Sequence, residues 1–251
     1  MFLIFGSSGF IGRYLRKALI KKYGKNSTVC IGRKDSDLNI NLTNFNNFKK
    51  IPKKKYDCVY ALAAKSSFTT ERYKKIQQTR YNKTIMKNII KFCKNNKVKK
   101  IIYFSSSAVY SNRNSIPFHE SQIVNPSNNL GMSKYKIEKN LKKEFLYSQT
   151  KIIILRIFTV YGRNMRKNQF LNEAIKKFKS RKKKLIFYNK QTLRNFIHID
   201  DLINILLKFT ILKIANYTIY NVGSSKSIKV ASIINYLNTI CKYKKKIIFK
   251  S

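Results

Sequence analysis

The sequence predicts an α/β protein with a doubly wound parallel sheet. One reason is that short apolar runs alternate with segments whose apolar residues recur at helical spacing, up to about Gly162. Another is that the first apolar run, Phe2–Phe5, leads directly into a glycine-rich turn and then into a helical pattern. Strands that alternate with helices in this way imply right-handed crossovers and parallel strands, with ligands held at the carboxyl ends of the strands.

The alternation can be followed along the chain. Strands are expected at 2–5, 28–31, 57–62, 100–105 and 152–156, and helices after Gly9, around 81–92 and around 137–145. Beyond Gly162 the rhythm loosens, with helices expected around 171–178, 200–209 and 230–237 and a strand at 185–188. We found no internal repeat and no long linker. We therefore expect a nucleotide-binding domain over 1–162, with returning segments near 196–223, and a small abbreviated C-terminal cap formed mainly by 163–251.

The composition is globular but very basic. Lysine and arginine number 54 against 10 aspartates and glutamates, a net charge of +44, which would ordinarily suggest nucleic-acid binding. The lysines are spread through every surface segment and mixed with asparagine and isoleucine, which is typical of a compositional bias, so we expect no specific nucleic-acid partner. Such a surface could still collect phosphate-bearing substrates or rest on anionic lipid.

Other classes of protein are disfavoured. The apolar runs fall far short of the roughly 18 residues that a membrane span requires, and we expect a cytoplasmic protein. The four cysteines form no Cys-x-x-Cys pair, so the sequence predicts neither a metal site nor a disulfide framework.

The glycine-rich turn has the chemistry of a nucleotide-binding loop. Its spacing, Gly6-x-x-Gly9-x-x-Gly12, lets the backbone turn sharply, lets a pyrophosphate approach the main chain and lets the helix pack close to the strand. The alternative is a glycine-rich turn without a ligand, but the strand before it and the helix after it favour binding. The expected contacts are Gly6, Ser8, Gly9, Phe10, Ile11 and Gly12.

This spacing, with its Gly9-Phe10-Ile11-Gly12 ending, resembles the extended branch of the short-chain dehydrogenase/reductase superfamily, the NAD(P)-dependent epimerases, dehydratases and reductases of nucleotide sugars. Three later segments, 155–162, 194–202 and 220–223, resemble further motifs of that family, and the resemblance extends over about residues 1–242. It implies a Rossmann-like fold, a nicotinamide cofactor, a nucleotide-sugar substrate held by the cap and a role in making surface polysaccharide. It also leaves room for a homodimer.

The resemblance assigns a cofactor-binding role to several further residues. The second strand runs out into Gly32-Arg33-Lys34, and an arginine there accommodates the 2′-phosphate of NADP, so NADP is favoured over NAD. The alternative is that Arg33 is one more solvated base. The remaining cofactor contacts that the resemblance implies are Asn41 and Leu42 near the adenine, Leu62, Ala63 and Ala64 along the cofactor wall, and Asn82, Lys134 and Phe158 on the nicotinamide side.

The catalytic residues that the resemblance implies are Ser106 and Lys134. Ser105 to Tyr110 resembles the family's catalytic strand end, in which Ser106 would bond the reacting sugar oxygen, although serines there can also be simple turn formers. Four residues before Lys134, where the family has its catalytic tyrosine, stands Leu130, which has no proton to exchange. Tyr135 would lie about 140° around the helix from Leu130 and is a poor substitute.

Three explanations of Leu130 remain open. Another group transfers the proton, or the protein binds a nucleotide or dinucleotide without turning it over, or the chain is a decayed copy. His198 precedes an expected helix and is interpreted as a structural residue.

Overall fold

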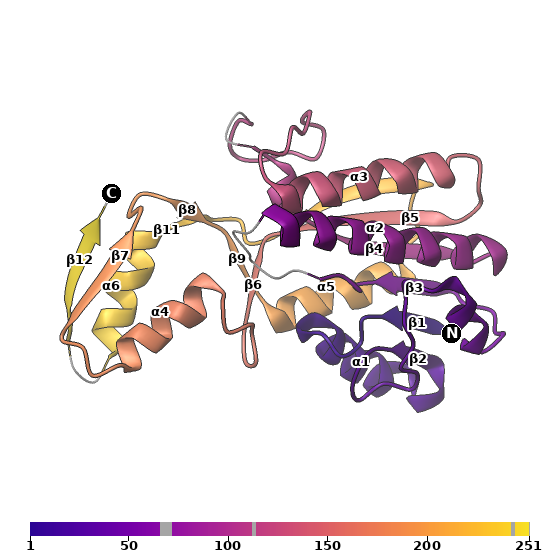
Figure 1. Cartoon of the computed structure of the whole chain (residues 1–251), viewed down its shortest axis with the longest axis horizontal. Coiled ribbons are helices and arrows are strands. Elements are labelled where there is room, and N and C mark those ends of the chain that lie inside the picture. The colour runs from indigo at the N-terminus through magenta and orange to yellow at the C-terminus, as the bar shows by residue number, and fades with distance from the viewer. Residues whose placement is uncertain (66–71, 112–113, 242–243, 251) are drawn as a thin grey trace. The chain divides into compact units, whose positions relative to one another are not determined.

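The computed structural model describes residues 1–65, 72–111, 114–241 and 244–250 (Figure 1). The chain forms two compact units. The first comprises Met1–Ile157 and Asp200–Val222, and the second comprises Phe158–Ile199 and Gly223–Ser251. That the first unit holds a dinucleotide and the second caps a substrate stays a prediction at this point.

The first unit is built on a six-stranded sheet in the order β10-β5-β4-β3-β1-β2, in which every pairing is parallel. Its strands are β1 (Phe2–Phe5), β2 (Thr28–Ile31), β3 (Cys58–Ala61), β4 (Lys100–Ser106), β5 (Lys151–Ile157) and β10 (Tyr217–Val222). Its helices are α1 (Phe10–Tyr23), α2 (Arg72–Asn95), α3 (Asn129–Glu144) and α5 (Ile199–Ile211), with 3-10 turns η1 (Lys25–Ser27), η2 (Phe45–Lys50) and η3 (Ser107–Val109).

The central strands are apolar throughout because both faces of the sheet are covered. Figure 1 shows α2 and α3 along one face and α1 and α5 along the other. Alternate residues of β3 therefore point to opposite sides: Val59 joins the core beneath α2 and α3, whereas the Tyr60 hydroxyl lies 2.5 Å from the Thr210 hydroxyl of α5. In the described parts of the chain, no helix combines the length and the apolar character needed to cross a bilayer.

The second unit packs two helices and short strand pairs around a small core of its own. The pairs are β6 with β9, β7 with β12 and the antiparallel β8 with β11. Its core includes Ala174, Phe178, Leu185 and Ile234. The elements are β6 (Thr159–Tyr161), α4 (Phe170–Lys179), β7 (Lys184–Tyr188), β8 (Leu193–Arg194), β9 (Phe196–His198), β11 (Ile228–Lys229), α6 (Val230–Ile240) and β12 (Lys246–Lys250).

The fold class predicted from the sequence is confirmed, as a parallel sheet with helices on both faces. Each expected strand and helix exists, but helices are longer than the apolar pattern suggested, notably α2 and α3. The sequence did not predict β10, β12 or the short pairs β6, β8, β9 and β11. Runs of two or three residues carry too little periodicity, and β10 has half-buried residues at most positions instead of an apolar run.

A buried lysine joins the sheet to the end of α5. Lys100 opens β4 and is only 9% exposed. Its ammonium group donates hydrogen bonds of 2.9, 3.0 and 2.9 Å to the carbonyl oxygens of Phe209, Thr210 and Leu212. These carbonyls end the helix without intrahelical partners, and a positive charge there also favours the helix dipole. Burial lowers the pKa of Lys100, and the three acceptors offset its lost hydration.

Replacing Lys100 by methionine keeps the length of the side chain but leaves these carbonyls without a donor. We expect Lys100→Met to lower the free energy of unfolding by about 1–3 kcal/mol. The control is the neighbouring Lys99→Met: the Lys99 side chain is 58% exposed in its ion pair with Asp57, and its loss is expected to cost under ~1 kcal/mol. Urea denaturation of both variants measures the difference. An equal loss in the two would contradict a capping role for Lys100.

Candidate functional site

The glycine-rich loop between β1 and α1 is shaped by close backbone contacts. Gly6 has a φ of +96°, and a Cβ there would lie 2.8 Å from the Ala63 nitrogen. A Cβ on Gly12 would lie 2.2 Å from the Gly6 carbonyl oxygen. Neither position has room for a side chain. The loop backbone therefore lies in close contact with both the helix and the segment that follows β3. The structure thus brings Gly6 and Gly12 together with the predicted cofactor wall, Leu62, Ala63 and Ala64.

Helix α1 starts at this loop with unpaired amides. Gly9 is the N-cap, and no side chain caps the helix. The N–H groups of the first turn, at Phe10, Ile11 and Gly12, point out of the helix without intrahelical acceptors. The Phe10 ring itself is buried, edge-on to Tyr14 at 5.8 Å, so Phe10 can offer only its backbone to a ligand. This arrangement suits an anionic group, because both the amides and the helix dipole favour negative charge.

The end of β2 is tied to the same loop through Ser8. The Ser8 hydroxyl oxygen accepts hydrogen bonds from the N–H of Arg33 at 2.6 Å and of Lys34 at 3.4 Å. The neighbouring Ser7 hydroxyl lies 2.8 Å from that of Ser36. The Arg33 side chain is exposed and has no hydrogen-bond or ion-pair partner among the described residues. Three hydroxyl groups, those of Ser7, Ser8 and Ser36, therefore lie near the first turn of α1, next to the backbone of the bases Arg33 and Lys34.

The other predicted cofactor residues hold loops in place. Asn82 accepts a hydrogen bond from the Lys65 N–H at 2.8 Å and donates one to the Lys65 carbonyl at 2.9 Å, which fixes the segment after Ala64. Leu42 accepts at its carbonyl a hydrogen bond of 2.9 Å from Asn88, and Asn41 accepts at its side-chain oxygen hydrogen bonds from Thr43. Their contact with a cofactor stays a prediction.

Ser106 lies at the end of β4, where the chain enters η3. Its hydroxyl oxygen accepts a hydrogen bond from the Ala108 N–H at 3.2 Å. Because the oxygen acts as acceptor there, its own O–H remains a donor for a ligand. Helix α3 starts against this turn: a Cβ on Gly131 would lie 1.9 Å from the Ala108 carbonyl oxygen. Only glycine lets Leu130 and Lys134, on the first turns of α3, come this close to the strand end.

Lys134 turns back toward the strand. Its ammonium group donates a 2.5 Å hydrogen bond to the Phe104 carbonyl oxygen and lies 4.9 Å from the centre of the Tyr103 ring. An ammonium group has three N–H donors, so this contact is compatible with a ligand hydroxyl as a further acceptor. Leu130, one turn earlier, is half-buried.

Two nearby tyrosines are unsuited to replace the phenol that Leu130 lacks. The Tyr103 hydroxyl is buried without a hydrogen-bond partner among the described residues, and burial, with the charge of Glu138, raises its pKa well above the usual value. The Tyr110 hydroxyl donates to the Asn221 side-chain oxygen at 2.8 Å and accepts from Arg156 at 3.0 Å. The Tyr103 phenol is therefore too weak an acid to exchange a proton, and the Tyr110 hydroxyl already uses its hydrogen-bonding capacity on other residues.

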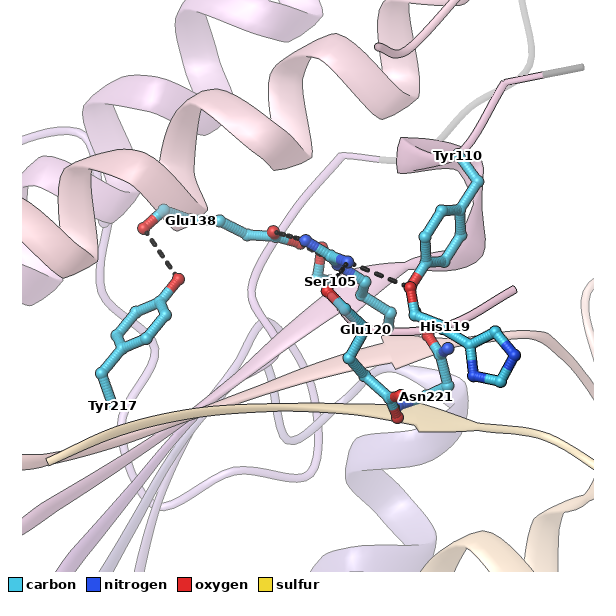
Figure 2. Close-up of polar contacts among 8 residues, drawn as sticks. Ser105, Tyr110, His119, Glu120, Glu138, Tyr217 and Asn221 are labelled. Atoms are coloured by element: carbon cyan, nitrogen blue, oxygen red, sulfur yellow. Dashed lines mark hydrogen bonds and ion pairs between the residues drawn. The ribbon is translucent and has the colours of Figure 1, made fainter. Parts of the chain in front are cut away.

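Behind the strand end lies a buried ion pair between Glu138 of α3 and Arg156 of β5 (Figure 2). The side chains are 2% and 3% exposed, and Arg156 Nη2 lies 2.9 Å from Glu138 Oε2. The Ser105 hydroxyl donates to Glu138 Oε1, to which Arg156 Nε also donates at 3.4 Å. Burial alone would lower the pKa of Arg156, but the hydrogen bonds and charge of Glu138 raise it. The pair links α3, β4 and β5.

The network continues to the edge of the sheet. Arg156 donates to the Tyr110 hydroxyl, and Tyr110 stacks on Phe118 with ring centres 4.6 Å apart. The Asn221 N–H donates to Glu120 Oε1 at 2.7 Å, and its side-chain amide donates to the Phe118 carbonyl at 2.9 Å. Residues 118–120 therefore cover the end of the edge strand β10. Tyr110, Glu138, Arg156 and Asn221, which are far apart in the sequence, thus converge here.

The sequence reasoning gave none of these residues a role. A signal was nevertheless present, because Arg156 is the one charged residue in the apolar run Ile152–Ile157, and Glu138 follows Lys134 by one turn on the buried face of α3. A lone charge at a buried position requires a partner of opposite sign.

The second unit contains Phe158, His198 and an unusual arginine. Phe158 lies next to Gly223, where a Cβ would be 3.0 Å from the Phe158 ring. The His198 ring packs edge-on to Tyr161 at 5.1 Å. The Nε–H of Arg194 is buried without a hydrogen-bond partner among the described residues, and its guanidinium carbon lies 5.0 Å from the centre of the Phe170 ring. Burial lowers the pKa of Arg194, and no carboxylate within the described chain compensates the charge.

A doubly wound sheet with a glycine loop at the start of its first helix defines a nucleotide-binding α/β protein. Residues 2–223 match the model of the NAD dependent epimerase/dehydratase family, and the chain belongs to that family. It is an extended short-chain dehydrogenase/reductase, as the resemblance implied.

Relatives of named activity are distant in sequence. A dTDP-D-glucose 4,6-dehydratase from Dictyostelium discoideum is 28% identical over an alignment of 254 positions that covers 88% of this chain and 58% of that protein. Among solved structures, RMD from Pseudomonas aeruginosa complexed with NADPH has a TM-score of 0.87 at 19% identity, covering 99% of this chain and 86% of that one. MoeE5 in complex with UDP-glucuronic acid and NAD has a TM-score of 0.85 at 20% identity, covering 100% and 85%. These structural likenesses show the fold.

The Glu138–Arg156 pair provides a test of how the strand end is held. Glu138→Ala leaves a buried guanidinium without its counter-charge and is expected to cost ~3–5 kcal/mol in the free energy of unfolding. The double variant Glu138→Leu with Arg156→Met, which removes both charges, is expected to recover most of that loss, because it buries apolar groups of similar size. Urea unfolding of wild type, Glu138→Leu, Arg156→Met and the double variant measures the coupling. Additive losses would contradict a coupled pair.

Proposed function

We propose that this protein is a cytoplasmic NAD(P)-dependent epimerase, dehydratase or reductase of a nucleotide sugar, working in surface polysaccharide biosynthesis. The observation that supports it most is the fit of the first unit to a dinucleotide. Gly6 and Gly12 leave room for no side chain, and the first turn of α1 offers free amides beside them. A purely structural turn would not need both features.

The residues present fit a nicotinamide dinucleotide. The amides of Phe10 to Gly12 would hold its pyrophosphate, and Leu62 to Ala64 would line its wall. Arg33 and Lys34, with Ser8 and Ser36 beside them, provide the positive charge and hydroxyl groups that a 2′-phosphate requires. Asn41 and Leu42 would lie at the adenine, and Asn82 and Phe158 toward the nicotinamide. When bound, such a cofactor supplies hydride transfer.

Two residues of the chain would act on the substrate. Ser106, whose oxygen is held by the Ala108 amide, would donate its O–H to the oxygen on the sugar carbon that is oxidised or reduced. Lys134 would hold the cofactor ribose from its position at the Phe104 carbonyl. Since Leu130 cannot exchange a proton, the proton has to pass through another group or through water, which makes turnover slower than in relatives with a positioned acid or base.

In this proposal the second unit binds the substrate. Within the described part of the chain, Arg194 has a buried N–H without a hydrogen-bond partner and a charge without a carboxylate partner, and an anionic group such as the diphosphate of a nucleotide sugar would satisfy both requirements. A second candidate function, a binder that holds cofactor or nucleotide sugar without turnover, is favoured by Leu130 alone.

The cofactor preference has a direct test. We expect the protein to bind NADP(H) more tightly than NAD(H), because Arg33 lies exposed beside the Ser8 hydroxyl. Arg33→Ala is then expected to weaken NADP(H) binding about tenfold or more and to leave NAD(H) nearly unchanged, since a charge-assisted contact contributes ~1.5–3 kcal/mol. Calorimetric titration measures both. Equal losses, or a preference of wild type for NAD(H), would overturn the assignment.

The activity itself is tested by incubating the purified protein with UDP-, GDP-, CDP- and dTDP-sugars and each nicotinamide cofactor, and analysing the products. We expect turnover that falls in Ser106→Ala, through lost polarisation of the sugar oxygen, and in Lys134→Ala, through lost ribose binding. A positioned acid or base contributes about 10² to 10⁴ in rate, so slow turnover without one remains measurable.

Leu130→Tyr separates the two candidate functions. In an enzyme whose proton transfer has moved elsewhere, this substitution is not needed for activity. In a binder, wild type holds cofactor without product, and Leu130→Tyr, which restores a phenol one turn from Lys134, recovers a trace. Full turnover that survives Ser106→Ala combined with Lys134→Ala would show that the chemistry lies elsewhere in the molecule.

A further inference from the structure

The outer face of α2 and α3 carries a dense array of lysines with almost no acidic residue. The described part of α2 contains no aspartate or glutamate, and its bases recur at three- and four-residue spacing. By helical geometry the α2 lysines fall within an arc of roughly 80°, and the α3 lysines behave similarly. We call this set the lysine face: Lys83, Lys87, Lys91 and Lys94 of α2 and Lys136, Lys139 and Lys143 of α3, all exposed.

Much of this charge is not neutralised within the protein. Lys94 pairs with Glu144 at 2.9 Å, and Lys91 and Lys139 lie over the rings of Phe45 and Tyr135. The other four, Lys83, Lys87, Lys136 and Lys143, have no hydrogen-bond or ion-pair partner in the described chain. Among the described residues of the two helices, Glu144 is thus the one carboxylate that is not buried, since Glu138, the other acid of α3, is buried with Arg156. Packing such charges together costs free energy unless an anion approaches.

Not every helix of the first unit carries such an array. The exposed residues of α5 are Asp200, Asp201, Asn204, Lys208 and Ile211, with two acids against one base. Figure 1 shows α5 on the opposite side of the sheet from α2 and α3, together with α1, which has five bases and no acid. The acids of α5 offset part of the charge of α1, so the first unit is more positive on the side of α2 and α3.

From this polarity we propose that the lysine face binds an anionic phospholipid surface. The two helices lie side by side in one layer, with their carboxyl-terminal ends joined by the Lys94–Glu144 pair, and so present the charges as a flat array. Lysine is a flexible point charge that suits diffuse attraction to headgroups, and each one near such a surface strengthens binding. Ile76 and Met132, toward the amino-terminal ends of the same helices, are 44% and 40% exposed and provide apolar contacts for the interface.

Two other occupants fit this face less well. Single-stranded nucleic acid is usually held by several aromatic side chains between the bases, whereas a single aromatic ring is largely exposed on the described parts of α2 and α3, that of Tyr73 at the start of α2. A second copy of the chain, packed on the same face by a two-fold axis, would set lysines against lysines. The proposal does not depend on the function proposed for the site.

Vesicle co-sedimentation tests the proposal with the full chain. The probes are vesicles of phosphatidylcholine alone and vesicles with about one third phosphatidylglycerol, at ~0.1 M salt, where the screening length is about 10 Å. Wild type is expected to bind only the anionic vesicles and to be released by high salt. The fourfold variant Lys83→Gln, Lys87→Gln, Lys136→Gln and Lys143→Gln is expected to bind at least tenfold more weakly, since each lysine near such a surface contributes roughly fivefold.

The matched control removes the same number of charges elsewhere on the first unit: Lys17→Gln, Lys21→Gln, Lys53→Gln and Lys54→Gln, all exposed positions. It is expected to bind within about threefold of wild type. Circular dichroism checks that both variants fold. Equal weakening in the two variants would overturn the proposal in favour of diffuse charge, and unchanged binding of the face variant would overturn it outright. If the fourfold variant no longer bound a single-stranded RNA probe but still bound the anionic vesicles, the lysine face would be assigned to nucleic acid instead.

Discussion

The buried ion pair between Glu138 and Arg156 determines where the strand end and α3 lie. Two charges at 2% and 3% exposure are costly to bury, and the cost is offset only because their hydrogen-bonding groups are satisfied. The partners are Ser105, which immediately precedes Ser106, and Tyr110, which ends the same turn. Ser106 is therefore fixed from both sides. Lys134 stands one helical turn before Glu138, so the same pair also sets the position of the lysine.

Close backbone contacts complete this frame. Gly131 lets α3 touch the Ala108 carbonyl, and Gly12 lets α1 touch the Gly6 carbonyl. These contacts depend on the absence of a side chain, whereas the identity of residue 130 affects neither. The frame that places a serine hydroxyl and a lysine ammonium at the strand end thus persists without the phenol. In the function that we propose, Leu130 therefore alters the proton transfers available and leaves these backbone contacts unchanged.

Much of the fold follows from patterns that the sequence shows directly. An apolar run such as that around Val59 in β3 predicts a strand buried on both faces. The spacing of Gly6, Gly9 and Gly12 predicts a strand that turns into a helix. Long-range pairings are different, because nothing local in the chain links Ser8 to the Arg33 amide or Asn221 to Glu120. Arg156 illustrates the limit: its isolation among apolar residues implies a partner, but only the folded chain shows that this partner is Glu138.

The charges of the first unit are arranged differently in its buried network, at the glycine-rich loop and on the lysine face. The buried network near Ser106 balances its charges internally, as Arg156 is paired with Glu138. The loop at Gly6 to Gly12, by contrast, offers amides beside the exposed Arg33 and Lys34, and the lysine face offers ammonium groups without ion-pair partners among the described residues. Electrostatic attraction between solvent-exposed charges is screened within about 10 Å at ~0.1 M salt. The lysine face can therefore act on a surface it touches, while an anion bound at the loop depends on local groups such as Arg33 and the first turn of α1.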